Sequence, residues 1–405
     1  MRNLLGIAAT ALLFAGSALS LGATDFFARD FGARPDGVTL NTASIQAAID
    51  FASSRGGGRV VLDKGDYISG SIYLKNNVTL HIEKDAALVG SLNPYDYVKD
   101  PDAKWTALIL AVKQENIGLT GEGIVDGRGF DVGVRFVDFV HMGLIDDKLG
   151  NDRVNETIRP ENIHMYLCNN VTIKDITLKD PACWTQQYDK CRDLLIEGIT
   201  VDAKCYWNND GLDVVDCSDV IVRDCYIDSS DDSYCFKSHS NDGVSENILV
   251  ENCVGRSSAN GIKFGTYTRG KFKHFRFKNM TIFDTYRSAI TIATVDGAQI
   301  EDVEIDSLKS LNTGHPIFLR TGTRNVYGSQ VPCLKDVVIK NMYAEVPFDK
   351  PDAGYSYEGP VEDLPRNVCP SIIAGLPGLR IENVRMENLE IVYPGHAAPE
   401  YAFAG

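Results

Sequence analysis

The chain of 405 residues is short of positive charge and of long apolar runs. Its 40 Lys and Arg residues are outnumbered by 55 Asp and Glu residues, which gives a formal net charge of −15. Nucleic acid would be repelled over most of such a surface, so we expect no nucleic-acid partner. Beyond the N-terminus no apolar run approaches the ~20 residues that cross a bilayer, so we also expect no membrane span.

The N-terminal segment has the order of a secretory signal peptide. Arg2 precedes an apolar run from Leu4 to about Leu19, and small residues follow. A membrane anchor is the alternative, which the short run disfavours. We predict a signal peptide at residues 1–23, cleaved after Ser20 or Ala23, and export to the periplasm or the extracellular space. No linker divides residues 24–405, so we expect one domain. We also expect the protein to be a monomer.

Cysteine pairs with metal-binding spacing are missing too. None of the ten cysteines belongs to a Cys-x-x-Cys pair, and we expect no metal and no other cofactor. Disulfides are possible in an exported chain. Because Cys168, Cys191 and Cys217 share one position of the repeat described next, a ladder of buried free thiols is an alternative of at least equal weight.

The sequence does contain a repeat, in which apolar residues lie 3, 5, 8 and 10 positions after a start residue. From Cys168 these residues are Val171, Ile173, Ile176 and Leu178. Alternation predicts a strand, and the step from the second to the third residue predicts a turn into another strand. The same pattern starts again at Cys191, Cys217, Ser245, Phe272, Ile300, Leu334 and Ile381, with weaker copies at Ser245 and Ile300.

The first six starts are 23 to 28 residues apart. Units of this length, built of short strands and corners, are typical of a parallel β-helix. A leucine-rich repeat is the rival, but its leucine-dominated spacing and regular helical half are absent. We predict an all-β fold, a right-handed parallel β-helix. The interruption at residues 344–375 is interpreted as a surface insertion.

The open end of such a solenoid needs a cap that hides its apolar interior. In the segment 42–52, Ile45, Ala48, Ile49 and Ala52 lie along one helical face, and the glycines 56–58 follow. This segment is therefore predicted to be an N-terminal capping helix.

Three aspartates follow the last predicted strand of two consecutive units. Asp231 and Asp232 come 21 and 22 residues after Asp210. This spacing is close to one turn of the solenoid, so we expect the three carboxylates on one face. Like charges raise at least one pKa, so one carboxyl can stay protonated and act as an acid while its neighbours stay ionised. Glycoside hydrolysis needs that division of roles.

The alternative is structural, because Asp and Asn favour turns at solenoid corners. We interpret Asp213, Asp219 and Asp224 in this way, as solvated or capping residues.

These segments resemble glycoside hydrolase family 28, the polygalacturonase-like enzymes of the pectin-lyase-like β-helix superfamily. The resemblance covers nearly all of residues 24–405 and includes FGARPDGVTLNTASIQAAID, GGGRVVLDKGDY and GEGIVDGRG. The family signature Asn-Thr-Asp-Gly, followed by Asp-Asp, is matched by Asn208-Asn209-Asp210-Gly211 and Asp231-Asp232. It implies an inverting hydrolase in which Asp231 is the general acid, Asp210 and Asp232 hold and activate water, and Asn208 orients the site by hydrogen bonding.

The chain departs from the family in two places. The family's Gly-His-Gly segment corresponds to residues 257–265, which lack histidine, and its Arg-Ile-Lys corresponds to residues 290–292, Ile-Thr-Ile. Lys237 and Lys263 are candidates to supply substrate-binding cations instead, with solvated lysines as the alternative. Trp207 and Trp184 are candidates to stack on a sugar ring, with core packing as the alternative.

We therefore predict hydrolysis of a glycosidic bond in a pectin-type or related polysaccharide, galactose-configured or anionic. One alternative is a calcium-dependent β-helix polysaccharide lyase, and another is a non-catalytic carbohydrate-binding β-helix. Endo or exo action is expected to depend on loops that close the cleft, such as residues 147–160 or the late insertion.

Overall fold

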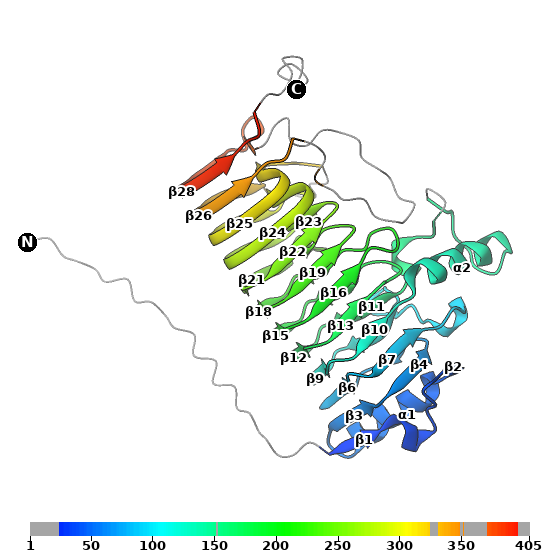
Figure 1. Ribbon diagram of the computed structural model, residues 1–405. Helices are drawn as coiled ribbons and strands as arrows, with labels where there is room; N and C mark the ends of the chain where they lie inside the picture. Colours follow the sequence, from blue (N-terminus) through cyan, green and yellow to red (C-terminus); the bar gives the residue numbers. More distant parts are fainter. Residues whose placement is uncertain (1–23, 151–152, 325–330, 349–350, 352–370, 396–405) are drawn as a thin grey trace, which may run out of the picture.

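The computed structural model describes residues 24–150, 153–324, 331–348, 351 and 371–395. Within them the chain forms a right-handed parallel β-helix, which confirms the predicted fold (Figure 1). The predicted signal peptide, Cys369 and most of the predicted insertion lie outside the described residues. Within the described part of the chain, no helix is long and apolar enough to span a membrane.

The coils stack into three parallel sheets. The first stack contains the first two apolar positions of each repeat unit, and Val171 pairs with Leu194, which pairs with Val220, in the predicted register. Its strands are β1 (Asp25–Phe27), β3 (Gly58–Leu62), β6 (Val78–Ile82), β9 (Glu115–Thr120), β12 (Asn169–Lys174), β15 (Arg192–Glu197), β18 (Ser218–Arg223), β21 (Val244–Glu251) and the first parts of β24 (Lys271–Ala293), β25 (Gln299–Arg320), β26 (Cys333–Glu345) and β28 (Ile381–Val392).

The second stack contains the third and fourth apolar positions. Its strands are β2 (Asp36–Leu40), β4 (Gly65–Ser69), β7 (Ala86–Gly90), β10 (Ile124–Asp126), β13 (Thr177–Lys179), β16 (Thr200–Ala203), β19 (Tyr226–Ser229), β22 (Val254–Ser257) and later parts of β24, β25, β26 and β28.

The third stack is the one that the repeat pattern does not contain. Its strands are β5 (Ile72–Tyr73), β8 (Ala107–Val112), β11 (Glu161–Tyr166), β14 (Gln186–Asp189), β17 (Leu212–Val215), β20 (Tyr234–Ser238), β23 (Asn260–Thr268), the ends of β24 and β25, and β27 (Ser371–Ala374).

The corner between the first two stacks is made by one residue with left-handed backbone, seven positions after each start residue. Glycine, asparagine and aspartate tolerate this conformation best, which explains their recurrence there. Asp224 is one of them (φ 56°), and Asp219 occupies a similar corner earlier in the same coil (φ 58°). The set comprises Asp175, Gly198, Asp224, Asn252, Asn279, Ser307, Asn341 and Asn388.

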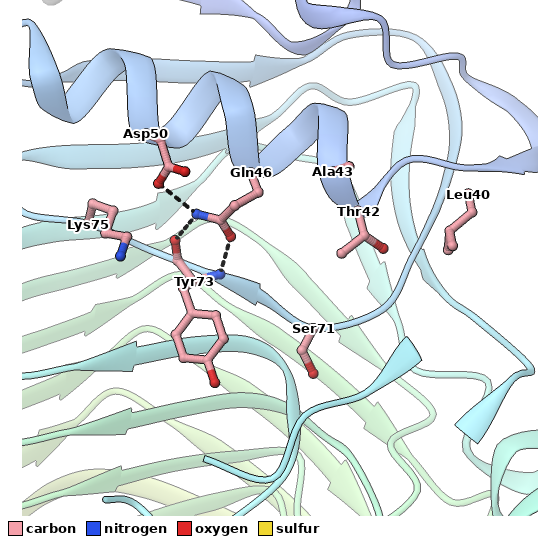
Figure 2. Close-up of a pocket in the computed structure, with 8 residues that line it drawn as sticks. All are labelled: Leu40, Thr42, Ala43, Gln46, Asp50, Ser71, Tyr73 and Lys75. Atoms are coloured by element: carbon pink, nitrogen blue, oxygen red, sulfur yellow. Dashed lines mark hydrogen bonds between the residues drawn. The ribbon is translucent and has the colours of Figure 1, made fainter. Parts of the chain in front are cut away.

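The predicted cap is helix α1 (Thr42–Ser54), and the apolar face predicted for it is fully buried. The Gln46 side chain also pairs with the edge of β5: Nε2 donates to the Tyr73 carbonyl oxygen (3.0 Å), and Oε1 accepts from the Tyr73 amide (2.8 Å). Figure 2 shows both bonds in a pocket between α1 and β5. The cap thus covers the apolar interior and satisfies an exposed strand edge.

The remaining helices lie outside the coils. Helix α2 (Gly129–His141) projects from the side of the solenoid (Figure 1). The short 3-10 helices are η1 (Ala28–Phe31), η2 (Pro94–Asp96) and η3 (Glu156–Ile158).

The repeated cysteines are free thiols. The Sγ atoms of Cys168, Cys191 and Cys217 lie 3.5, 3.4 and 3.2 Å from the carbonyl oxygens of Ala111, Met165 and Tyr188. The nine cysteines of the described residues are all unpaired. For this part of the chain, the thiol ladder is therefore confirmed.

Candidate active site

Asp210 and Asp232 occupy corresponding places in adjacent coils. Asp210 lies just before β17, and Asp232 lies in the connection between β19 and β20. The Gly211 amide donates to the Asp232 carbonyl oxygen (2.8 Å), and the Asp231 amide donates to that of Asn209 (3.2 Å). One carboxylate oxygen of Asp210 and one of Asp232 lie within 4.8 Å of each other. Coil stacking therefore brings these aspartates together, as the spacing predicts.

Asp231 is the most accessible of the three. It is partly exposed, whereas Asp210 and Asp232 are 4% and 5% exposed. Its Oδ1 atom accepts a hydrogen bond from the Asp232 amide at 3.0 Å. A substrate atom can thus reach Asp231 more easily than the two carboxylates beside it.

Two buried lysines contact this cluster. Nζ of Lys237, on β20, donates to Oδ2 of Asp210 at 2.8 Å and also to Oδ1 of Asp213. Nζ of Lys263, on β23, donates to Oδ2 of Asp232 at 3.1 Å. The two lysine side chains are 3% and 11% exposed. The solvated alternative for both lysines is therefore wrong.

The solvated or capping role expected for Asp213 is also wrong. Asp213 lies on β17, is 0% exposed and contacts Lys237. Sequence reasoning missed it because the third stack is absent from the apolar repeat. The available signal was its separation of 24 residues from Lys237, about one coil.

Electrostatic surroundings distinguish Asp231 from Asp232. Burial raises the pKa of Asp231, and the Asp232 carboxylate raises it further. Burial alone would raise the pKa of Asp232 too, but the Lys263 ammonium and the Asn260 amide lower it below the ordinary value. A carboxyl that holds its proton more tightly than usual therefore lies beside one that loses its proton more readily.

Burial raises the pKa of Asp210 well above its ordinary value. The ammonium of Lys237 opposes this effect, and the carboxylates of Asp213, Asp231 and Asp232 add to it. Asp210 therefore accepts a proton more readily than an exposed aspartate does.

The segment that lacks the family's histidine contributes Asn260, which sequence reasoning also missed. Nδ2 of Asn260 donates to Oδ1 of Asp232 at 2.6 Å, and Oδ1 of Asn260 accepts from the Thr291 hydroxyl at 2.9 Å. Arg287, one coil further on, lowers the pKa of both Asp231 and Asp232. The coils that lack the histidine and the Arg-Ile-Lys segment therefore still supply polar and cationic groups to the cluster.

Asn208 and Trp207 lie beside the cluster and contact other residues. Oδ1 of Asn208 accepts from the Arg159 guanidinium at 2.8 Å, and the Arg153 guanidinium lies 4.0 Å from the centre of a Trp207 ring. Among the described residues, no hydrogen bond joins Asn208 to the three aspartates. The neighbouring Asn209 is buried and fixes the loop before β17 through bonds to four backbone groups.

Trp184 is packed in the interior of the site. It is 3% exposed, and Nζ of Lys237 lies 3.7 Å from the centre of its ring. The packing alternative for this tryptophan is therefore correct.

A second buried pair, Glu161 and His164 on β11, lies two coils before Asp210 and was not predicted. Both are 0% exposed, and Nδ1 of His164 lies 2.9 Å from Oε2 of Glu161. Burial raises the pKa of Glu161 well above its ordinary value, and the Asp213 carboxylate adds to this. Burial lowers the pKa of His164 to about 4. No motif or spacing in the sequence marks this pair.

Asp210, Asp232 and Cys235 bring three possible metal-ligand atoms within 4.8 Å of one another. Calcium prefers six to eight oxygen ligands. Here the two carboxylates already bind lysine ammonium groups, and burial raises the pKa of the Cys235 thiol well above its usual range. This donor set fits a calcium ion poorly.

Comparison with known proteins identifies the family. The model of the family described as "Glycosyl hydrolases family 28" matches residues 57–349. A Vitis vinifera protein named "Probable polygalacturonase" is 27% identical over 344 residues, which cover 80% of this chain and 62% of that protein. An exo-poly-alpha-D-galacturonosidase of Dickeya chrysanthemi is 25% identical, and only 40% of its length is covered. The chain thus spans less than two thirds of the length of these relatives.

Solved structures support the fold. A structure from Parabacteroides merdae is 35% identical, with 57% of this chain and 95% of that chain covered and a TM-score of 0.51. The hyperthermoactive exopolygalacturonase of Thermotoga maritima is 21% identical, with 91% and 87% covered and a TM-score of 0.69. From the matched family model, the chain belongs to glycosyl hydrolases family 28.

Proposed function

We propose that this family 28 glycoside hydrolase cleaves a glycosidic bond in a pectin-type or related polysaccharide, galactose-configured or anionic. Membership of the family supports the reaction class. Relatives named as polygalacturonases support a substrate that contains galacturonate. The lysines and Arg287 near the aspartates are compatible with an anionic chain, although both lysines already bind carboxylates.

In the proposed mechanism Asp231 is the general acid. Its proton passes to the glycosidic oxygen as the bond from that oxygen to the anomeric carbon breaks. A water molecule held by Asp210 and Asp232 attacks the carbon from the opposite face and gives one proton to a carboxylate. The anomeric configuration is thereby inverted, and we predict roughly 6.5–9.5 Å between the acid and the base carboxyl groups.

The observation that carries this proposal is the contrast between Asp231 and Asp232. Asp231 is partly exposed with a raised pKa, and Asp232 is buried with a lowered one. Adjacent carboxyls with opposite shifts supply the protonated and the ionised group of a glycosidase.

The test is a panel of polygalacturonate, rhamnogalacturonan, galactan and sulfated galactan, incubated with wild-type and Asp231→Asn protein. We expect turnover of at least one galacturonate- or galactose-containing glycan, lost in the variant, with inverted products in proton NMR. Asp219→Asn is the matched control, since it makes the same change at a solenoid corner. Retained configuration would contradict the inverting mechanism, and full activity of Asp231→Asn would remove Asp231 from the acid role.

The same panel separates the alternatives. A calcium-dependent lyase would lose activity with a chelator and give an unsaturated product that absorbs in the ultraviolet. A non-catalytic carbohydrate-binding protein would bind a glycan and turn over none, with and without Asp231→Asn.

We further propose that residues 1–23 direct export and that residues 24–405 form one catalytic domain, active as a monomer. The apolar run at the N-terminus and the continuous solenoid support this. The N-terminal sequence of the mature protein and its mass in solution test these points; an uncleaved N-terminus or a stable dimer would contradict them.

A further inference from the structure

The third stack is covered on its outer face, unlike the first. In β15 of the first stack, buried and accessible residues alternate, as expected for a strand with one face toward solvent. Every residue of β14, β17 and β20 in the third stack is buried. Other parts of the chain must therefore lie over the outer face of these strands, where the aspartates are.

Aromatic rings form part of this cover before the aspartates. The Trp105 ring lies 6.1 Å from the His164 ring and 4.6 Å from the Trp184 ring, measured between centroids. Trp184 in turn covers the ammonium of Lys237. Tyr267, which follows the aspartates in the chain, packs against Trp184 at 6.4 Å. Trp105 and Trp184 thus cover the coils before the aspartates, and Tyr267 reaches back to Trp184 from β23. We call these three residues the wall.

Residues 153–160, which we call the strap, fasten this wall. The Tyr267 hydroxyl donates to Oε1 of Glu156 at 2.9 Å, a contact across 111 positions of sequence. The Thr106 hydroxyl donates to the Thr157 carbonyl oxygen at 3.1 Å. Arg159 is 1% exposed and donates to the carbonyl oxygens of Ala182 and Trp207. The strap is therefore bound to coils before and after the aspartates.

The covered face is polar, which a purely structural wall would not require. Among the described residues, Gln187 leaves both amide atoms without a hydrogen-bond partner, Asp213 leaves Oδ2 and Thr185 leaves its hydroxyl. An unpaired buried polar atom destabilises the folded state.

We propose that the strap and the wall of Trp105, Trp184 and Tyr267 close the substrate site on the N-terminal side of the aspartates. The enzyme then acts on chain ends and releases terminal residues. A polymer bound in its middle must continue past the aspartates in both directions, and the strap with Trp105 and Trp184 blocks the N-terminal one. This inference rests on the proposed function and specifies its mode of action.

The test compares products and viscosity for wild-type enzyme on a glycan that it hydrolyses. We expect the smallest sugars from the first minutes and little loss of viscosity while reducing ends accumulate. An early ladder of long oligosaccharides with a rapid fall in viscosity would overturn the inference and leave the proposed hydrolysis intact. If no glycan is hydrolysed, the proposed function fails, and binding of polygalacturonate samples of different chain length by Asp231→Asn protein decides the inference. Affinity that follows the concentration of chain ends supports it, and affinity that follows total sugar overturns it.

Variants at the contact between the strap and Tyr267 test whether this contact closes the end of the site. Tyr267→Ala and Glu156→Ala should open the closed end and raise the share of longer products several-fold. Glu156→Gln keeps an acceptor for the Tyr267 hydroxyl and should keep the wild-type products. Tyr226→Ala is the matched control, because Tyr226 is an exposed tyrosine on the second stack. Unchanged products in both alanine variants, with the fold intact by circular dichroism, would contradict the role of the strap.

Discussion

Nζ of Lys237 lies 2.8 Å from Oδ2 of Asp210, and both groups are buried, with the ammonium against the Trp184 ring. Asp213 contacts the same ammonium, so one cation serves two carboxylates. A buried charge that loses its partner is costly, which makes Lys237 a position where stability and activity depend on the same atom.

We expect Lys237→Met to lower the free energy of unfolding by about 3–5 kcal/mol, because it leaves two carboxylates without their cation. Activity should fall with it, since the Asp210 carboxylate then holds its proton. Urea unfolding and kcat measure the two effects. Asp213→Asn leaves the bond between Lys237 and Asp210 in place. It should therefore lower the free energy of unfolding and kcat by less than Lys237→Met does. A small loss of stability and activity in Lys237→Met, together with a large loss in Asp213→Asn, would contradict this account.

Lys263→Met should move the acid limb of the rate profile to higher pH. The Lys263 ammonium is the strongest of the groups that lower the pKa of Asp232. If Asp232 must be ionised to activate water, removal of that charge raises the pH at which activity appears. Profiles of kcat/KM against pH measure the shift, and Lys309→Met on an exposed strand position is the control. An acid limb that stays in place would exclude Asp232 from the ionised role.

Asp231→Asn should be more stable than wild type at neutral pH, although inactive. The pKa of Asp231 is raised in the folded state, so the folded protein holds this proton more tightly than the unfolded chain. That stabilisation is present below the unfolded pKa and is lost as pH rises through the folded pKa. The amide has no charge to bury, so it avoids this loss. Thermal unfolding at pH 4 and pH 7 measures it; a variant that is less stable than wild type at pH 7 would contradict the prediction.

His164 should make the protein sensitive to acid. Its folded pKa is about 4 against an ordinary value of 6.5, because burial favours the neutral ring. The unfolded chain therefore binds a proton first, and stability falls as pH drops from 6.5 toward 4, by about 3 kcal/mol in total. Unfolding free energies across this range, for wild type and His164→Gln, isolate the effect. If the unfolding free energy changed equally with pH in the two proteins, His164 would not be the source of the acid sensitivity.

Reducing agent should leave the melting temperature unchanged. Cys168, Cys191 and Cys217 donate to backbone carbonyls, and the cysteines of the described residues form no disulfides. Titration of the unfolded protein should find at least nine thiols. A melting temperature that falls several degrees with dithiothreitol would show a disulfide that contributes to stability.

Local patterns in the sequence are enough to predict the solenoid, its cap and the meeting of the aspartates. Apolar alternation and the break between two strands are local properties, so the register from Val171 to Leu194 could be predicted from one unit to the next. The apolar face of α1 followed from helical spacing. Asp210 and Asp232 meet because 22 residues is close to one turn, which needs no knowledge of the third stack.

The groups that surround those aspartates depend on how the coils pack, and the sequence does not reveal them. The third stack has no regular apolar spacing from the second, because the corners between them vary in length: residues 204–211 connect β16 to β17, and residues 230–233 connect β19 to β20. The strand positions of Asp213 and Lys237 therefore could not be predicted. The contact between Glu156 and Tyr267 joins residues 111 positions apart, and no local pattern encodes it. Charge pairing and burial, which set the pKa values here, arise only when distant coils pack together.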